Sequence, residues 1–215
     1  HDVTIITENV VMDFTYSVPN LTTDQYSKRH RVVRKFADYM SLRGEGETIR
    51  PLPKSKSSGR IVPHIYTDKE LVLLLETAQK INPVPRLRPH TFYTLLGLLA
   101  STGIRVSEAI NLDISDVDFG SGVLKIRYTK FKKSRLVPIH PTTLEALESY
   151  DALRREVTLD PKDNAFFISK FKTRLTYPTV NATFLQIVRA AGIRNIEGKG
   201  SRIHDLRHTF AVRRV

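Results

Sequence analysis

The feature that most constrains the fold is an apolar segment near the middle of the chain. Within residues 91–101, hydrophobic side chains occupy every side of a helix: Phe92, Leu95, Leu96, Leu98 and Leu99. A helix that is hydrophobic all round must be buried, so this segment predicts the centre of a domain. Thr102 and Gly103 end it, and a second helix is expected to begin at once with Arg105 in its first turn.

Helical periodicity recurs on both sides of that segment. Thr67 followed by Glu70 has the spacing of a capping box, in which each side chain accepts a hydrogen bond from the other residue's backbone N–H. This pair predicts the start of an amphipathic helix. Further helices are expected over residues 141–156, over residues 179–191 and from residue 204 onward, and the last would bury Leu206, Phe210 and Val212.

One β-hairpin interrupts the helices. Apolar and basic residues alternate over residues 122–128, a lysine-rich connection follows, and residues 135–139 return. A short apolar strand is expected at residues 165–168. Because helices precede and follow one small sheet, the expected fold class is mainly α with a small antiparallel β-sheet, α+β.

The first 50 residues contain one predicted helix, from about residue 22 to residue 42. Its cap is expected to be Thr22, Thr23 or Asp24. Its buried stripe is expected to consist of Val32, Val33, Phe36, Tyr39 and Met40. Basic residues on its other sides form either a solvated face or one that faces DNA: Lys28, Arg29, Arg31, Arg34 and Lys35. One such helix cannot bury its own core, so residues 1–50 are expected to be a partial domain.

Residues 51–64 are predicted to be a linker. Three prolines, three serines and basic residues that include Lys54 and Lys56 cannot pack as a core. They fit either a tether along a phosphate backbone or a surface loop. The expected organisation is thus a partial helical domain over 1–50, this linker, and a main domain over 65–215. The chain begins at His1, and we expect it to be a fragment or a processed product.

Composition limits the partners and the chemistry. The chain has 34 Lys and Arg against 22 Asp and Glu, and this net charge of +12 at pH 7 favours a polyanion such as nucleic acid. The alternative is a protein that is basic for solubility alone. No cysteine is present, which excludes disulfides, thiolate zinc sites and cysteine nucleophiles. No apolar run reaches the ~18 residues that a membrane span requires.

The end of the chain groups cationic and proton-exchanging side chains. His204, Arg207 and His208 lie three and four residues apart, so they share one face of a helix and can converge on an anion such as a phosphate. Arg105 follows a tight turn, and Glu108 three residues later can hold its guanidinium. A planar guanidinium held by a carboxylate suits two oxygens of one phosphate.

Together and in this order, these motifs resemble those of the tyrosine recombinase (phage integrase) family. The family's first arginine box is matched by residues 102–108. Its β-hairpin lysine and the Leu-Val-Pro strand behind it are matched by Lys130 and residues 135–138. Its His-x-x-Arg box is matched by residues 204–211. The resemblance covers the chain from about residue 67 to the C-terminus. Residues 1–50 would then resemble part of the family's helical core-binding domain.

The resemblance implies a reaction that breaks and rejoins DNA strands. A tyrosine attacks phosphorus, which gives a 3′-phosphotyrosyl link and a free 5′-hydroxyl. Because the ester retains the bond energy, the family requires no cofactor, neither ATP nor a metal.

The resemblance also implies a role for each motif residue. Arg105 and Arg207 would hold the two non-bridging oxygens of the phosphate. Lys130 would protonate the leaving 5′-oxygen, with Lys132 and Lys133 as alternatives, and His204 would exchange protons near the nucleophile. Supporting roles fall to Glu108 and His208.

One departure from the family concerns the nucleophile. The family's second histidine or tryptophan and its tyrosine follow the His-x-x-Arg box, but none of the residues after Arg207 is a tyrosine. Tyr177, the closest tyrosine before the box, is expected to pack or cap beside Pro178. We therefore expect this fragment to bind DNA without cleaving it, and its parent to be a site-specific recombinase or integrase.

Three alternatives stay open. The first is that the chain is a non-catalytic DNA-binding remnant or regulator on the same scaffold. The second is that it is a relative of type IB topoisomerases, which share the Arg, Lys and His-x-x-Arg residues. The third alternative is a zinc site at His204 and His208. Zinc hydrolases with this spacing carry glutamate after the first histidine, where this chain has Asp205.

The resemblance implies that the partner is double-stranded DNA. The family assembles as a tetramer on DNA, and we expect the fragment alone to be monomeric. The expected location is the cytoplasm, at the nucleoid, with the parent encoded by a prokaryote, a phage or another mobile element. The residues expected to contact DNA are Lys28, Arg31, Lys35, Lys54, Lys56, Lys132, Lys133 and Arg135.

Overall fold

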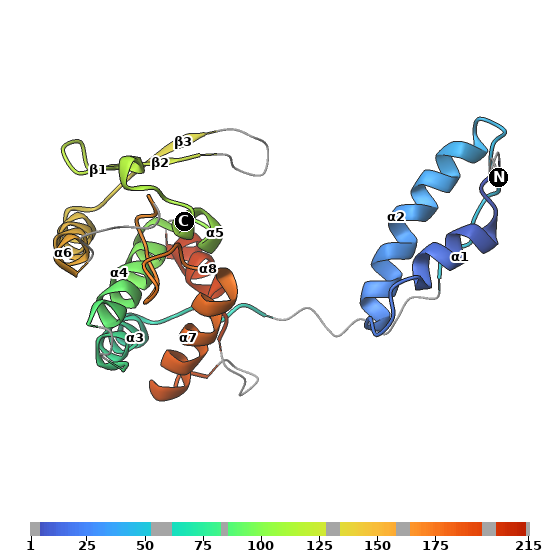
Figure 1. Ribbon diagram of the computed structural model, residues 1–215. Helices are drawn as coiled ribbons and strands as arrows, with labels where there is room; N and C mark the ends of the chain where they lie inside the picture. The colour runs from blue at the N-terminus through green and yellow to red at the C-terminus, as the bar shows by residue number, and fades with distance from the viewer. Residues whose placement is uncertain are drawn as a thin grey trace. The chain divides into compact units, whose positions relative to one another are not determined.

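Two compact units make up the chain, residues 1–62 and residues 63–215 (Figure 1). The computed structural model describes residues 5–52, 62–82, 86–127, 134–157, 164–194 and 201–213. None of the helices in these ranges is both long enough and apolar enough to pass through a bilayer.

The first unit is a pair of helices, α1 (Glu8–Tyr16) and α2 (Thr23–Ser41), that pack on each other. Thr22 caps α2 through a capping box with Gln25. A small core forms where Ala37 of α2 meets Val11 and Ile49. The sequence did not predict α1, because only two of its nine residues are buried and they leave too short a pattern to read.

The predicted buried stripe of α2 is wrong except at Val33, which packs against the small core. Val32, Phe36 and Tyr39 are 70%, 54% and 54% exposed, and Val33 and Met40 are only half-buried. The side of α2 that packs on the short α1 is instead the one that carries Ala37 and His30. The large apolar side chains therefore lie exposed on α2 together with basic residues.

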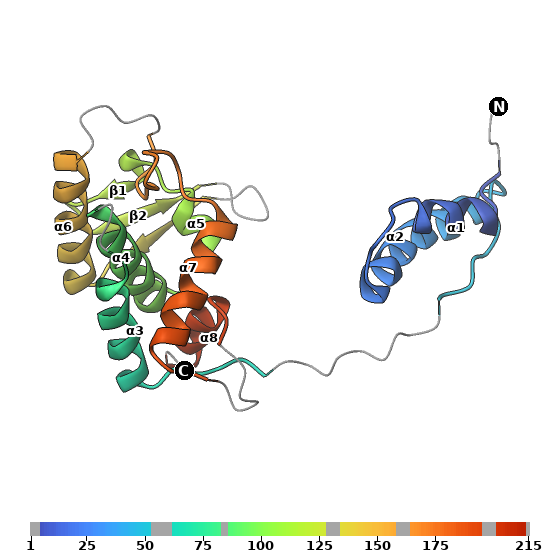
Figure 2. The same cartoon turned by 60° about the horizontal axis from the view of Figure 1, so that its bottom comes forward.

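Helix α4 (Leu87–Thr102) lies at the centre of the second unit, as its apolar sequence predicts, although it begins before residue 91. It packs against α3 (Asp68–Lys80), α6 (Pro141–Val157) and α8 (His204–Arg213), and Figure 2 shows them from a second side. α7 (Tyr177–Ala190) packs on α3 and on α5 (Val106–Ile110). The capping box of Thr67 and Glu70 starts α3, which confirms that prediction.

A three-stranded antiparallel sheet completes the second unit. β1 (Val117–Asp118) pairs with β2 (Val123–Ile126), and β2 pairs with β3 (Arg135–Pro138), which confirms the hairpin and the α+β class. β1 and the 3-10 turn η1 (Ile114–Asp116) before it are too short to show a pattern. Residues 165–168 are buried but form only isolated bridges to single residues, so the strand predicted there is wrong.

A turn at Gly103 joins α4 to α5 and sets the position of Arg105. Gly103 has a φ of 62°, and a Cβ at this position would lie 2.2 Å from Cδ1 of Phe210. Glycine is thus required both by the left-handed backbone and by the close approach of α8. Arg105 is the N-cap of α5 and not a residue of its first turn, which corrects the prediction. α8 buries Leu206 as expected but leaves Val212 exposed.

Candidate phosphate-binding site

Glu108 holds two arginines. Its carboxylate accepts hydrogen bonds from Nη1 of Arg105 at 2.9 Å and from both terminal nitrogens of Arg135, at 3.1 and 2.7 Å. It also accepts the backbone N–H of Arg105 at 2.8 Å. The side chain of Glu108 is 7% exposed, whereas those of Arg105 and Arg135 are 43% and 37% exposed. A buried carboxylate therefore fixes two guanidinium groups that solvent can still reach.

The charge of Glu108 is secured by these bonds. Burial alone would raise the pKa of its carboxyl, but the hydrogen bonds from Arg135 and Arg105 outweigh burial and lower the pKa to about 2. The hydrogen bond to Glu108 likewise raises the pKa of Arg135. Around neutral pH the three groups are thus one anion between two cations.

Arg207 reaches the same place from the C-terminal helix. Its Nη1 donates to the carbonyl of Gly103, two residues before Arg105. Burial lowers the pKa of Arg207, the positive charges of Arg105 and Arg135 lower it further, and Glu108 opposes them. We call these residues (Arg105, Glu108, Arg135 and Arg207) the arginine cluster. Its three cations exceed its one carboxylate, so the cluster attracts an anion.

The start of α8 repeats the arrangement at the start of α5. Asp205 is buried and accepts the backbone N–H of Arg202 at 2.8 Å and its Nη2 at 2.9 Å. Glu108 likewise accepts hydrogen bonds from the backbone N–H and the side chain of Arg105, three residues before it. An arginine held by a buried acid therefore lies at the N-cap of α5 and two residues before the first residue of α8.

His204 lies on the exposed side of α8, one turn before Arg207. Its ring stacks on the ring of Tyr177, with centroids 6.2 Å apart and planes at 27°. Tyr177 is the first residue of α7, directly after the cap Thr176. His208 is also exposed. Arg207 and His204 thus present a guanidinium and an imidazole from consecutive turns of one helix.

The remaining predicted site residues fall in different places. Arg135, expected to contact DNA, donates to Glu108. Lys28 pairs with Asp24 on α2, and Arg31 and Lys35 are exposed there. Some predicted residues lie outside the described residues, namely Lys54, Lys56, Lys130, Lys132 and Lys133.

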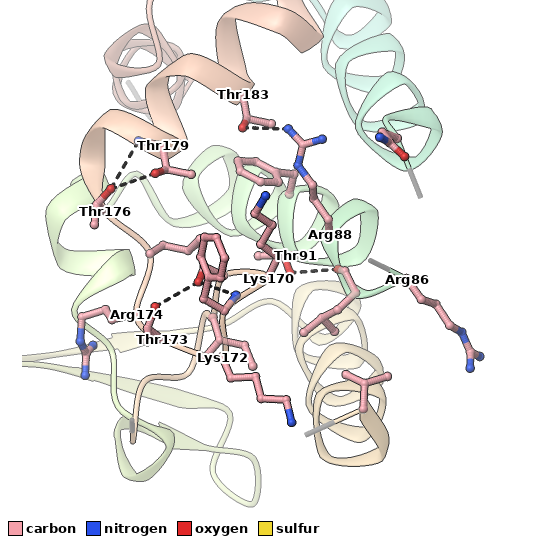
Figure 3. Close-up of a pocket in the computed structure, with 18 residues that line it drawn as sticks. Arg86, Arg88, Thr91, Lys170, Lys172, Thr173, Arg174, Thr176, Thr179 and Thr183 are labelled. Carbon is pink, nitrogen blue, oxygen red and sulfur yellow. Dashed lines mark hydrogen bonds between the residues drawn. The ribbon is translucent and has the colours of Figure 1, made fainter. Parts of the chain in front are cut away.

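A separate cavity of about 690 Å³ lies among the first residues of α4, the first residues of α7 and residues 168–175 (Figure 3). It is mainly apolar, and the basic residues that line it include Arg88, which donates to Thr183 at 3.3 Å. No motif residue lines it, so the arginine cluster is the candidate site. Within the ranges that the structure describes, no three His, Cys, Asp or Glu residues are grouped as a metal site would need.

Comparisons of sequence place the chain among known proteins. Residues 65–214 match the family described as the phage integrase family. The protein y4rE of Sinorhizobium fredii (strain NBRC 101917 / NGR234), named as an integrase/recombinase, is 40% identical over 212 residues, which are 97% of this chain and 67% of that protein. Tyrosine recombinase XerC of Chlamydia caviae is 34% identical over 156 residues, 70% of this chain and 47% of that protein.

Solved structures share the fold. The XerA recombinase is 25% identical with a TM-score of 0.58, over 97% of this chain and 68% of that chain. The Tn1549 transposon integrase in complex with transposon right end DNA is 17% identical with a TM-score of 0.69, over 97% and 72%. The XerH recombinase bound to its difH substrate is 23% identical with a TM-score of 0.66, over 96% and 59%. On the sequence match and this shared fold, the chain belongs to the phage integrase family of tyrosine recombinases.

Proposed function

We propose that this chain holds the scissile phosphate of double-stranded DNA in site-specific recombination. The observation that carries the proposal is the arginine cluster, in which Arg207 of α8 donates to the Gly103 carbonyl, two residues before Arg105 at the N-cap of α5. A guanidinium presents its N–H donors in a fixed plane, and two such groups match the two non-bridging oxygens of one phosphodiester. Buried Glu108 keeps Arg105 in position before DNA arrives.

The chemistry requires positive charge where the pentavalent phosphorane forms. The tyrosine oxygen bonds to phosphorus, the bond from phosphorus to the 5′-oxygen breaks, the tyrosine gives up its proton and the 5′-oxygen takes one up. Arg105 and Arg207 stabilise the oxygens that gain charge. By analogy with the loss of one oxyanion donor, removing either arginine should cost about 3 kcal/mol in the transition state, roughly 100-fold in rate.

The proton transfers are assigned to the remaining motif residues. His204 exchanges a proton near the nucleophile, and the stacked ring of Tyr177 holds its imidazole. A lysine of the hairpin, Lys130 or in its place Lys132 or Lys133, protonates the 5′-oxygen. The ester keeps the bond energy and the arginines supply the fixed positive charge, so the proposed reaction uses neither ATP nor a metal.

The first unit is proposed to bind the same DNA duplex. Residues 1–50 would be part of the helical core-binding domain, and the linker over 51–64 would follow the phosphate backbone. The exposed Arg31 and Lys35, together with Lys28, would face DNA, in keeping with the net charge of +12. XerH and the Tn1549 integrase were solved with DNA. We further propose assembly as a tetramer on DNA, a monomeric state for this chain alone and a location in the cytoplasm at the nucleoid.

A second candidate function is DNA binding without cleavage. It concerns these 215 residues, in which all eight tyrosines precede Arg207. Tyr177, the nearest of them, stacks on His204 at the start of α7, where a helix terminus fixes its backbone.

A covalent capture assay tests both candidates. We would compare the 215-residue chain with a chimera in which a C-terminal segment that contains the nucleophilic tyrosine of a tyrosine recombinase follows residue 213, using a pool of nicked suicide duplexes. The chain alone should bind DNA without linking to it, and the chimera should form a phosphotyrosyl adduct. Arg105→Ala and Arg207→Ala should each slow adduct formation roughly 100-fold and leave DNA binding within about threefold. Arg155→Ala, exposed on α6, is the control. A wild-type adduct level in either cluster variant would refute the assignment.

A further inference from the structure

We propose that Tyr66 is a positioning residue that fixes helix α8, and through it Arg207 and His204. The proposal rests on the function proposed above for those two residues. Tyr66 lies in the segment before α3, far from α8 in sequence, and no motif includes it.

All three polar groups of Tyr66 bond to α8 or to the residues that lead into it. The phenol hydroxyl and Oγ of Ser201 are 2.7 Å apart. The backbone N–H donates to Oγ1 of Thr209 at 3.0 Å, and the backbone carbonyl accepts Nη2 of Arg213 at 2.9 Å. These contacts fall before the first turn of α8, in its middle and at its end. Tyr66 therefore restrains the position of α8 along its axis, its rotation about that axis and its tilt.

Burial makes these bonds hard to replace with water. Tyr66 and Ser201 are each 1% exposed, and Thr209 is 2% exposed. A buried donor or acceptor that loses its partner keeps the full cost of leaving water, so the contacts with Ser201 and Thr209 disfavour any other position of α8. Burial also raises the pKa of the Tyr66 hydroxyl, which keeps it protonated and able to donate.

Tyr66 is itself held from the side of α3. The His64 ring meets the Tyr66 ring edge-on, with centroids 4.7 Å apart, and its Nε2 lies 3.1 Å from Oε1 of Glu70. Asp68, in the first turn of α3, pairs with Arg213 at 2.6 Å. Contacts with His64 and with the capped start of α3 therefore hold Tyr66 in place.

The consequence concerns the phosphate site. His204 and Arg207 lie between the Ser201 and Thr209 contacts, and Arg207 bonds to the Gly103 carbonyl on the α4–α5 turn. If α8 shifted or rotated, Arg207 would leave the arginine cluster although no residue of the cluster had changed. Tyr66 therefore acts on the phosphate site through α8 without touching the phosphate.

The test compares two tyrosines of the same unit in the 215-residue chain. Tyr66→Phe removes the hydroxyl that meets Ser201, and Tyr150→Phe removes an equally buried hydroxyl that accepts the backbone N–H of Ile168 at 3.2 Å. Hydrogen exchange would follow the amides of residues 204–213, and NMR would follow the guanidinium resonance of Arg207. Ser201→Ala should reproduce the effect of Tyr66→Phe, and the double variant should be no worse than either single one.

We expect amides of α8 to exchange roughly tenfold faster in Tyr66→Phe, beyond any change in the rest of the unit, and the Arg207 resonance to shift. Tyr150→Phe should do neither. Equal exchange in α8 and an unmoved Arg207 resonance in both variants would overturn the proposal. Failure of the proposed function would show differently, as adduct formation at the wild-type rate in the Arg207→Ala chimera, and would leave the comparison of exchange rates unaffected.

Discussion

Replacing Glu108 by glutamine removes the charge that two arginines share while it preserves the size of the side chain. The carboxyl pKa of about 2, against an ordinary 4.5, corresponds to about 3 kcal/mol of favourable interaction with the ionised form. Glu108 is only 7% exposed, so water screens it little, but both arginines are partly exposed. We therefore expect Glu108→Gln to lower the free energy of unfolding by about 2–3 kcal/mol.

The pH dependence of that loss follows from the direction of the pKa change. A carboxyl whose pKa is lowered on folding stabilises the protein above its unfolded pKa, here 4.5, and loses that contribution as pH falls through its folded pKa, here about 2. The difference in stability between the wild type and Glu108→Gln should be constant above about pH 5 and should shrink toward pH 2.

Thermal unfolding followed by far-UV circular dichroism measures this difference. At pH 7 the melting temperature of the second unit should fall by roughly 5–10 °C. Glu148→Gln, exposed on α6, is the matched control and should change it little. DNA binding should not weaken in Glu108→Gln, because the cluster loses a negative charge. A loss equal to that of Glu148→Gln, or a difference that persists unchanged at pH 2, would refute the role of the carboxylate.

Two further predictions concern the Gly103 turn and the charge of the chain. Gly103→Ala should destabilise the second unit by at least ~1 kcal/mol more than Gly192→Ala in chemical denaturation, because both positions have positive φ but only Gly103 faces Phe210; equal losses would contradict this packing. The logarithm of the DNA-binding constant should fall linearly with the logarithm of salt concentration, and Arg31→Ala with Lys35→Ala should reduce the slope by about 2. A flat salt response would argue against binding along the phosphate backbone.

Local spacing predicted the part of the site that local contacts build. Glu108 lies three residues after Arg105, and the expected contact between them is present. The bonds from Arg135 to Glu108 and from Arg207 to the Gly103 carbonyl join residues that are distant in sequence, so no periodicity reports them. Only the ordered motifs of a known family indicated that Arg105 and Arg207 belong together.

The central helix was predictable because its burial is complete, whereas the buried side of α2 was misread. The apolar run in α4 could only be a core helix, and it is one. In α2 the same reasoning failed, because a hydrophobic stripe shows which side of a helix could be buried but does not show against which side a neighbouring element packs. Phe36 and Tyr39 lie exposed, and the packed side carries Ala37 and Val33. The stacking of Tyr177 on His204 also depends on tertiary structure, so no pattern in the sequence predicts it.

A structure of the chain bound to a DNA duplex would test the central claim most directly, through the distances from the two guanidinium groups to the backbone. We predict that Arg105 and Arg207 each donate to a non-bridging oxygen of the same phosphate, at about 2.7–2.9 Å. Guanidinium groups bound to different phosphates, or turned away from the DNA, would contradict the account.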